Sequence, residues 1–161
     1  MRVQSDQPLE YVEEIMLRHK DRVLRTAVAI IGNVSEAEDI FQDVFVKLLE
    51  KQPRFESPEH EAAWLIRVTA NLCKNYLRSF WRKNTQQLFE THPAQTHEQH
   101  ELVEFINRLP VKFRIAIHLY YYEGYSIQEI AEMTDQKYST VGSHLSRARI
   151  MLKNFMEDEQ L

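Results

Sequence analysis

The chain has 161 residues, a net charge of −4, a pI near 6.0 and 43% hydrophobic residues. This length supports one ordinary hydrophobic core or two small ones. No apolar run approaches the ~20 residues that a membrane-spanning helix needs, and residues 1–10 are too polar for a signal peptide, so a cytoplasmic protein is expected. The single cysteine, Cys73, permits no internal disulfide, and its apolar neighbours predict a buried, inert thiol.

Only three glycines and five prolines occur, whereas strong helix formers are plentiful, so the composition predicts an all-α fold with short connections. The charge is segregated along the chain. Residues 35–61 carry a net charge of −5, residues 62–89 carry +5 without any acid, and residues 136–156 carry +4 without any acid. This alternation predicts separate surfaces for separate partners.

The first predicted helix covers residues 9–31 and ends at Gly32-Asn33, a pair that suits a left-handed helix cap. Ser35 and Glu38 then form an S-x-x-E capping box, which predicts the start of a second helix. The apolar residues that follow recur at helical spacing and predict one buried face: Ala37, Ile40, Phe41, Val44, Phe45, Leu48 and Leu49.

Residues 52–61 contain two prolines and are predicted to form a loop. A third helix is expected over residues 62–83, and it would complete a first domain that covers residues 1–83. Residues 84–99 have no Lys or Arg and little apolar content, which is typical of a linker. Three histidines gather in and directly after this segment, but solvated side chains are expected rather than a metal site: His92, His97 and His100.

A second domain is predicted over residues 100–161. Helices are expected over residues 101–108 and from Pro110 to Tyr122, with Gly124 as a cap. Ser126 and Glu129 form a second capping box, which would start a short helix over residues 126–133. Residues 134–137 then turn the chain into STVGSHLSRAR, residues 139–149.

The stretch 139–149 predicts a helix with one packed face and one polar face. At 100° per residue, the packed face comprises Val141, Leu145, Ala148, Leu152 and Phe155, and Thr140, Ser143 and Arg147 lie opposite. Together with the preceding short helix, this helix forms a helix-turn-helix, whose second helix normally enters the DNA major groove. Arg147 would then read a guanine or bind phosphate, and Arg149 and Lys153 would contact the backbone. An ordinary solvated basic helix is the alternative for this pattern taken alone.

Two motifs in the second domain resemble region 4 of bacterial sigma factors. They read LP...R....L...EGYS.QEIA from Leu109 and STV.S.LSRAR..L from Ser139. The first domain resembles sigma region 2: SEAEDIFQDVFVKLLE is similar to the region 2.2 helix, and AWLIRVTANLCKNYLR to the helix that meets promoter DNA. The chain is thus similar to extracytoplasmic-function (ECF) sigma factors over roughly residues 10–83 and 100–155.

This resemblance implies three sets of functional residues, each placed on this sequence by the matching motif. Core RNA polymerase would bind Asp39, Gln42, Asp43 and Val46. The −10 element would bind Trp64, Arg67, Asn71, Lys74, Asn75 and Arg78. The −35 element would bind Ser139, Thr140, Ser143, His144, Arg147 and Arg149. The loop over residues 54–61 would help to trap a flipped base of the −10 element.

The resemblance also implies the partners: the β′ clamp helices and β flap of core polymerase, promoter DNA and an anti-sigma factor, with a chain that is monomeric when free and not inserted in a membrane. No nucleotide-binding, metal-binding or nucleophile–base motif occurs, so we expect no enzyme activity, cofactor or metal. Two alternatives stay open. They are a LuxR-like helix-turn-helix regulator, since TVGSHLS also resembles that recognition helix, and a sigma-like decoy that binds polymerase without promoter activity.

Four positions depart from the family pattern. Gly142 and His144 stand where basic residues are usual in the recognition helix, Asn75 stands where aspartate is frequent, and Ala70 where arginine is common. Glycine costs about 1 kcal/mol in a helix interior, and its lack of a side chain removes a phosphate contact. Histidine carries a charge only near or below its pKa.

Overall fold

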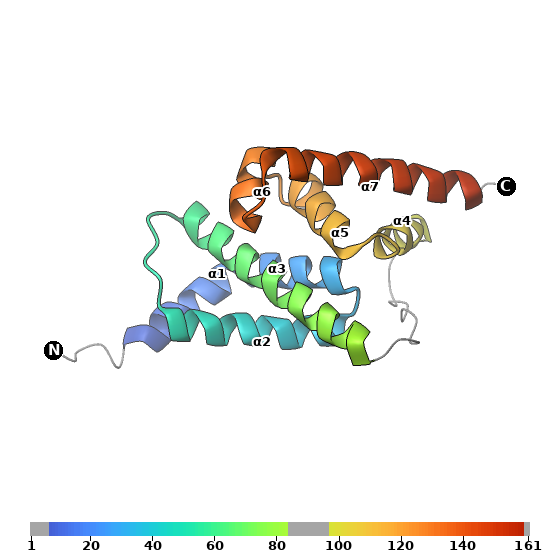
Figure 1. Ribbon diagram of the computed structural model, residues 1–161. Helices are drawn as coiled ribbons and strands as arrows, with labels where there is room; N and C mark the ends of the chain where they lie inside the picture. The colour runs from blue at the N-terminus through green and yellow to red at the C-terminus, as the bar shows by residue number, and fades with distance from the viewer. Residues whose placement is uncertain (1–6, 84–96, 160–161) are drawn as a thin grey trace. The chain divides into compact units, whose positions relative to one another are not determined.

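The computed structural model describes residues 7–83 and 97–159, and these residues form helices joined by short turns, without a strand (Figure 1). The predicted all-α fold is therefore confirmed. The described helices form two compact units: residues 1–28 with 34–85 make up the first, and residues 86–161 make up the second together with the short segment 29–33. In the described part of the chain, no helix has both the length and the apolar character that crossing a bilayer requires.

Three helices build the first unit: α1 (Gln7–Ile31), α2 (Val34–Lys51) and α3 (Pro58–Lys83). In Figure 1, α2 and α3 run close together, and these two helices pack against one another. The core residues are aliphatic and fully or almost fully buried: Val12, Ile15, Val23, Ile40, Val44, Leu48, Leu65 and Ile66. Cys73 is buried among them, as predicted.

The corner between α1 and α2 depends on a glycine. Gly32 has φ +83°, a conformation that costs glycine little, so α1 ends where the sequence predicts. The predicted capping box at Ser35 is wrong, because α2 begins at Val34 and Ser35 therefore lies inside its first turn. Asn33, another residue type that is favoured at helix N-caps, directly precedes the helix.

The third helix begins four residues before its predicted start. Pro58 is the first residue of α3, where a missing N–H leaves no helical hydrogen bond unmade and the fixed φ favours the helix. Ser57 caps this start, because its hydroxyl accepts a hydrogen bond from the backbone N–H of His60 at 3.1 Å. The connection between α2 and α3 is therefore residues 52–57, shorter than the predicted loop over 52–61.

The second unit contains α4 (His97–Asn107), α5 (Val111–Ile117), α6 (Ile127–Thr134) and α7 (Tyr138–Glu159). The start of α4 falls within the segment predicted as a linker, of which residues 84–96 lie outside the described residues. In Figure 1, α7 extends past both α5 and α6, and it packs against each of them. This arrangement buries Phe113, Ile130, Val141, Leu145 and Ala148.

The helix predicted through Tyr122 changes its hydrogen bonding partway. After α5, residues His118–Tyr122 form one π-helical turn, η1, in which the N–H of Glu123 donates to the carbonyl of His118 five residues earlier. The turn ends before Gly124, whose φ of +78° confirms it as a left-handed residue. Such single π-helical turns are often found at functional sites.

The helix-turn-helix is confirmed at its capping residues. The hydroxyl of Ser126 accepts from the N–H of Glu129 at 3.1 Å, and the carboxylate of Glu129 accepts from the N–H of Ser126 at 3.0 Å. At the other end of α6, Asp135 takes the left-handed conformation with φ 54°. Aspartate tolerates this conformation better than most residues, so the chain turns within residues 135–137 and enters α7.

Candidate nucleic-acid interface

The cationic residues of α3 lie on the side of the helix that faces away from the core. The buried side is built from Leu65, Ile66, Thr69, Cys73 and Leu77. Arg67, Asn71, Asn75 and Arg78 are exposed on the opposite side, and Lys74 is half-buried. Residues 62–83 contain no acid, so along this part of α3 the outer face attracts phosphates without a competing carboxylate.

The apolar side of α3 is rotated from the one that the sequence predicts. Helical spacing alone predicts an apolar stripe of Leu65, Val68, Leu72, Tyr76 and Phe80, but of these only Leu65 is buried and the others are half-buried. Threonine and cysteine fill the centre of the true buried side, and Thr69 satisfies its hydroxyl by donating to the carbonyl of Leu65 at 2.6 Å. The rotation leaves the predicted DNA-facing residues on the outside.

An aromatic cluster lies where the 52–57 loop meets α3. Trp64 is half-buried, on the same side of α3 as Arg67 and Asn71, which lie one and two turns further along. The ring of Phe55, from the loop, contacts Trp64 at 5.8 Å and His60 at 5.4 Å between centroids. Aromatic rings beside cations can stack on unpaired bases. The side chain of Trp81, the chain's other tryptophan, lies outside the described residues.

A partly buried ion-pair cluster holds the start of α3 against α1, and no sequence pattern predicts it. One carboxylate oxygen of Glu61 accepts from Arg18 at 2.5 Å and lies 3.0 Å from Nε2 of His19. Burial alone would raise the pKa of Glu61, but the hydrogen bonds from Arg18 and His19 outweigh it, so the pKa is lowered. This cluster fixes the first turn of the helix that carries Trp64 and the cationic face.

On α2, the acidic stripe is exposed. Asp39, Gln42, Asp43 and Val46 lie about one turn apart along the side away from the core, and 47% of the surface of Val46 is exposed.

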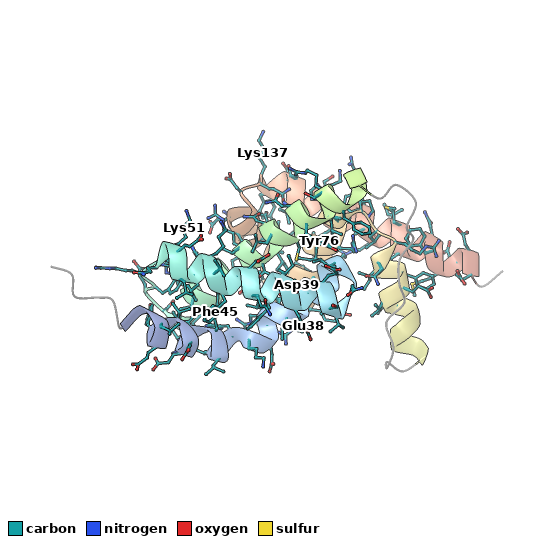
Figure 2. All side chains as sticks on the ribbon, turned by 90° about the horizontal axis from the view of Figure 1, so that it is seen from below. Glu38, Asp39, Phe45, Lys51, Tyr76 and Lys137 are labelled. Carbon is teal, nitrogen blue, oxygen red and sulfur yellow. The ribbon has the colours of Figure 1, made fainter. Side chains whose placement is uncertain are left out.

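A tyrosine links α2 to α3, and Figure 2 shows Asp39 on α2 and Tyr76 on α3. The hydroxyl of Tyr76 donates to Glu36, and burial, followed by this bond and the negative charge of Asp39, raises the pKa of Tyr76 to about 12. Tyr76 therefore links α2 to α3 as a neutral donor.

The first turns of α7 present hydroxyls, and cations lie on either side of them. Ser139 and Arg147 are exposed, and Thr140 and Ser143 are half-buried. Lys137, in the turn before α7, extends away from the ribbon in Figure 2. The predicted packing stripe is fully buried at Val141, Leu145 and Ala148 and half-buried at Leu152 and Phe155.

Two residues predicted to meet the −35 element make side-chain contacts with the α5–η1 segment. His144 is only 8% exposed, and its ring packs against that of Phe113 at 5.4 Å, so it fills the core of this unit. Arg149 donates from Nε to the hydroxyl of Tyr121 at 2.6 Å and lies over the rings of Tyr120 and Tyr121. Residue spacing along α7 could not reveal these contacts, because their partners lie on α5 and η1.

Arg149 borders an apolar groove of about 520 Å³ between α4, η1 and the second half of α7. Its walls are mostly apolar: Leu102, Ile106, Ile117, Tyr121, Tyr122, Leu152 and Met156. Lys153 and Glu157 lie at the groove with Arg149. Tyr121, Tyr122 and Met156 each keep more than two fifths of their surface exposed, so the groove is open to a partner.

Sequence comparisons assign both units to known regions. Sigma-70 region 2 matches residues 15–83, and sigma-70 region 4 matches residues 99–152. The ECF RNA polymerase sigma factor SigE of Mycolicibacterium smegmatis is 30% identical over 89% of this chain and 61% of its own length. The probable RNA polymerase sigma factor RfaY of Xanthomonas campestris pv. campestris is 27% identical over 84% of this chain and 38% of its own length. The chain thus spans less than two thirds of these two relatives.

A solved structure has the same fold. It is the sigma factor RpoE of Bartonella quintana in complex with the anti-sigma factor NepR, with a TM-score of 0.77 and 25% identity over 90% of this chain and 96% of that one. With both regions present, the chain belongs to the sigma-70 family of RNA polymerase sigma factors. Within that family, it belongs to the ECF group. A LuxR-like regulator is not favoured, because that alternative gives no account of the first unit.

Proposed function

We propose that this chain is an alternative sigma factor that binds core RNA polymerase and directs transcription from promoters with defined −35 and −10 elements. The observation that carries the proposal is the presence of sigma-70 regions 2 and 4 in one chain. Each region also contributes one helix with an exposed, acid-free, cationic face, namely α3 and the first half of α7. We assign residues 1–83 to −10 recognition and core binding, residues 84–99 to the linker, and residues 100–161 to −35 recognition.

The −10 element would bind along the outer face of α3. Its cations would follow the phosphates of the separated strand, and Trp64 with Phe55 would stack on an unpaired base: the proposed set is Trp64, Arg67, Asn71, Lys74, Asn75 and Arg78. Unstacking a base costs a few kcal/mol, and aromatic stacking returns about 1–3 kcal/mol. Binding energy can therefore drive opening without a chemical step, and we propose a protein that is not an enzyme and needs no cofactor.

Core polymerase would be held at two places. The acidic stripe of α2, Asp39, Gln42, Asp43 and Val46, would bind the β′ clamp helices through its two carboxylates and one exposed aliphatic side chain. The groove lined by Tyr121 and Met156 would receive the β flap, since aromatic residues and methionine are enriched at protein interfaces.

The double substitution Asp39→Arg with Asp43→Arg should weaken core binding at least tenfold. It turns two exposed carboxylates into cations, which would repel the positive groups of a partner that binds an acidic stripe. Native gel migration with core polymerase measures the effect. Glu10→Arg with Glu13→Arg makes the same charge change at exposed positions of α1 and serves as the matched control. Equal losses for the two variants would contradict the assignment of α2.

The substitution Arg147→Ala should lower transcription from promoters that contain a −35 element roughly tenfold, because a base or local phosphate contact is worth about 1–3 kcal/mol. Promoters that lack this element should change little. Lys112→Ala, which removes an exposed cation of α5, is the control. The role of Arg147 at the −35 element would be refuted by the same loss on both promoter classes.

An anti-sigma factor is proposed as the regulator, on the strength of the RpoE complex with NepR. Its surface on this chain would overlap the stripe of α2 or the groove of the second unit, since covering either one would prevent core binding. We further propose a cytoplasmic protein that is monomeric when free, in keeping with a partner-binding surface on each unit.

The deciding experiment is run-off transcription with purified core RNA polymerase and this protein, on the DNA upstream of its own gene and on fragmented genomic DNA. Transcripts with defined starts that are absent without the protein would support the proposal. If the protein comigrates with core but yields no transcript from any fragment, the decoy alternative replaces it. If the protein does not bind core, the assignment of the α2 stripe fails.

A further inference from the structure

Gly142 lies in the interior of α7, where glycine is the least favourable residue apart from proline. Its backbone gives no reason for a glycine, since only Gly32 and Gly124 have positive φ among the described glycines. Packing gives none either. A Cβ placed on Gly142 would meet no atom within 4 Å among the described residues, so an alanine would fit without strain.

The position of Gly142 suggests an external reason. It follows the buried Val141 by one residue and lies one helical turn after Ser139, in the first half of the second helix of the helix-turn-helix. In such motifs this part of the helix lies nearest to the base edges in the major groove. Glycine is also the residue that permits a backbone to approach a ligand closely.

The neighbours of Gly142 make a close approach necessary. Ser139 and Ser143 carry the shortest hydroxyl side chains, so they can hydrogen-bond to base edges only if the helix backbone itself lies deep in the groove. A larger side chain at position 142 would hold the helix away from the bases. It would also leave the longer Arg147 able to reach phosphate, since a guanidinium extends well beyond a serine hydroxyl.

We propose that Gly142 is a specificity-determining residue of the −35 interface: its missing side chain lets the first turns of α7 approach the base edges, so that Ser139 and Ser143 read them directly. This inference rests on the proposed function of the second unit. It predicts that a side chain at position 142 makes the protein more stable but weakens its recognition of DNA, because the side chain favours the helix and obstructs the approach to the bases.

The test uses the full chain bound to core polymerase and a library of duplexes randomised upstream of a fixed −10 region. In the protein without polymerase, Gly142→Ala should raise the melting temperature by about 4–8 °C, as measured by circular dichroism. It should also lower affinity for the sequences that the unsubstituted protein selects by about fivefold or more, and flatten the base preference. Gly142→Arg should bind more uniformly across sequences and with a steeper salt dependence, because it adds a phosphate contact.

Asn154→Ala is the matched control, because it raises the helix propensity of α7 at an exposed position outside its first half. It should stabilise the protein and leave the selected sequences unchanged. Equal or tighter binding of Gly142→Ala with the same base preference would overturn the role of Gly142 and leave the sigma function standing. If the unsubstituted protein enriches no upstream sequence, −35 recognition fails and the role of Gly142 fails with it.

Discussion

Replacing both Lys74 and Arg78 with glutamate should abolish promoter opening and leave the binding of core polymerase intact. The two side chains lie one turn apart on the acid-free outer face of α3, Arg78 exposed and Lys74 half-buried. Reversing both charges places two carboxylates against the phosphates of the separated strand. Like-charge contacts of this kind cost several kcal/mol, so we expect a loss of roughly a hundredfold or more in open complexes.

Permanganate reactivity of thymines in the −10 region measures the opened DNA, and comigration with core polymerase measures the partner contact. Lys20→Glu with Lys51→Glu is the matched control, since both lysines are exposed in the same unit on α1 and α2. The assignment of α3 predicts that only the first pair loses reactivity. Unchanged reactivity in the Lys74 and Arg78 variant would refute it, and loss of core binding would show that α3 also contacts the polymerase.

Helices and their ends could be predicted from the sequence wherever the cause is local. The capping box of Ser126 and Glu129 forms because both hydrogen bonds join residues three positions apart. Gly32 and Gly124 end their helices because glycine adopts positive φ at little cost. The starts of α2 and α3 were missed where two local signals compete. Asn33 and Ser35 can both precede a helix, and Pro58 is equally typical of a loop and of a first helical turn.

The candidate site could be predicted only in part, because several of its residues depend on contacts distant in sequence. Exposed residues such as Asp43, Arg78 and Arg147 follow from periodicity along one helix. His144 carries the same polar signature, yet Phe113 on α5 packs against it. Arg149 is likewise held by Tyr121, which is 28 residues away. No pattern within α7 contains this information, so sequence reasoning misses the contacts of polar residues at the edge of a helix stripe.

The cluster around Glu61 is the strongest example of such a distant contact, because it joins residues 42 and 43 positions apart. Glu61 resembles its neighbour Glu59 in the sequence, but its carboxylate is buried and accepts from Arg18 and His19. Glu61→Gln removes the negative charge and keeps the shape. We expect the first unit to lose about 1–3 kcal/mol of its free energy of unfolding, the usual cost of weakening buried hydrogen bonds to a charged group.

The pH dependence follows from the lowered pKa of Glu61. A carboxyl whose folded pKa lies below its unfolded value, near 4.5, adds stability above that value, and the contribution is lost as the pH falls through the folded pKa. The unsubstituted protein should therefore lose stability on acidification below about pH 4.5, and Glu61→Gln should lose less over the same range. Both tryptophans belong to α3, so their fluorescence during urea unfolding reports on the first unit.

Glu59→Gln separates the effect of burial from that of charge, because Glu59 is exposed two residues earlier in the same helix. It should change neither the unfolding midpoint nor its pH dependence. If Glu61→Gln were no less stable than Glu59→Gln at pH 7, the cluster would not hold α3 in place. A destabilised Glu61→Gln protein should also open promoters less well, because the first turn of α3 carries Trp64 and begins the face that we assign to the −10 element.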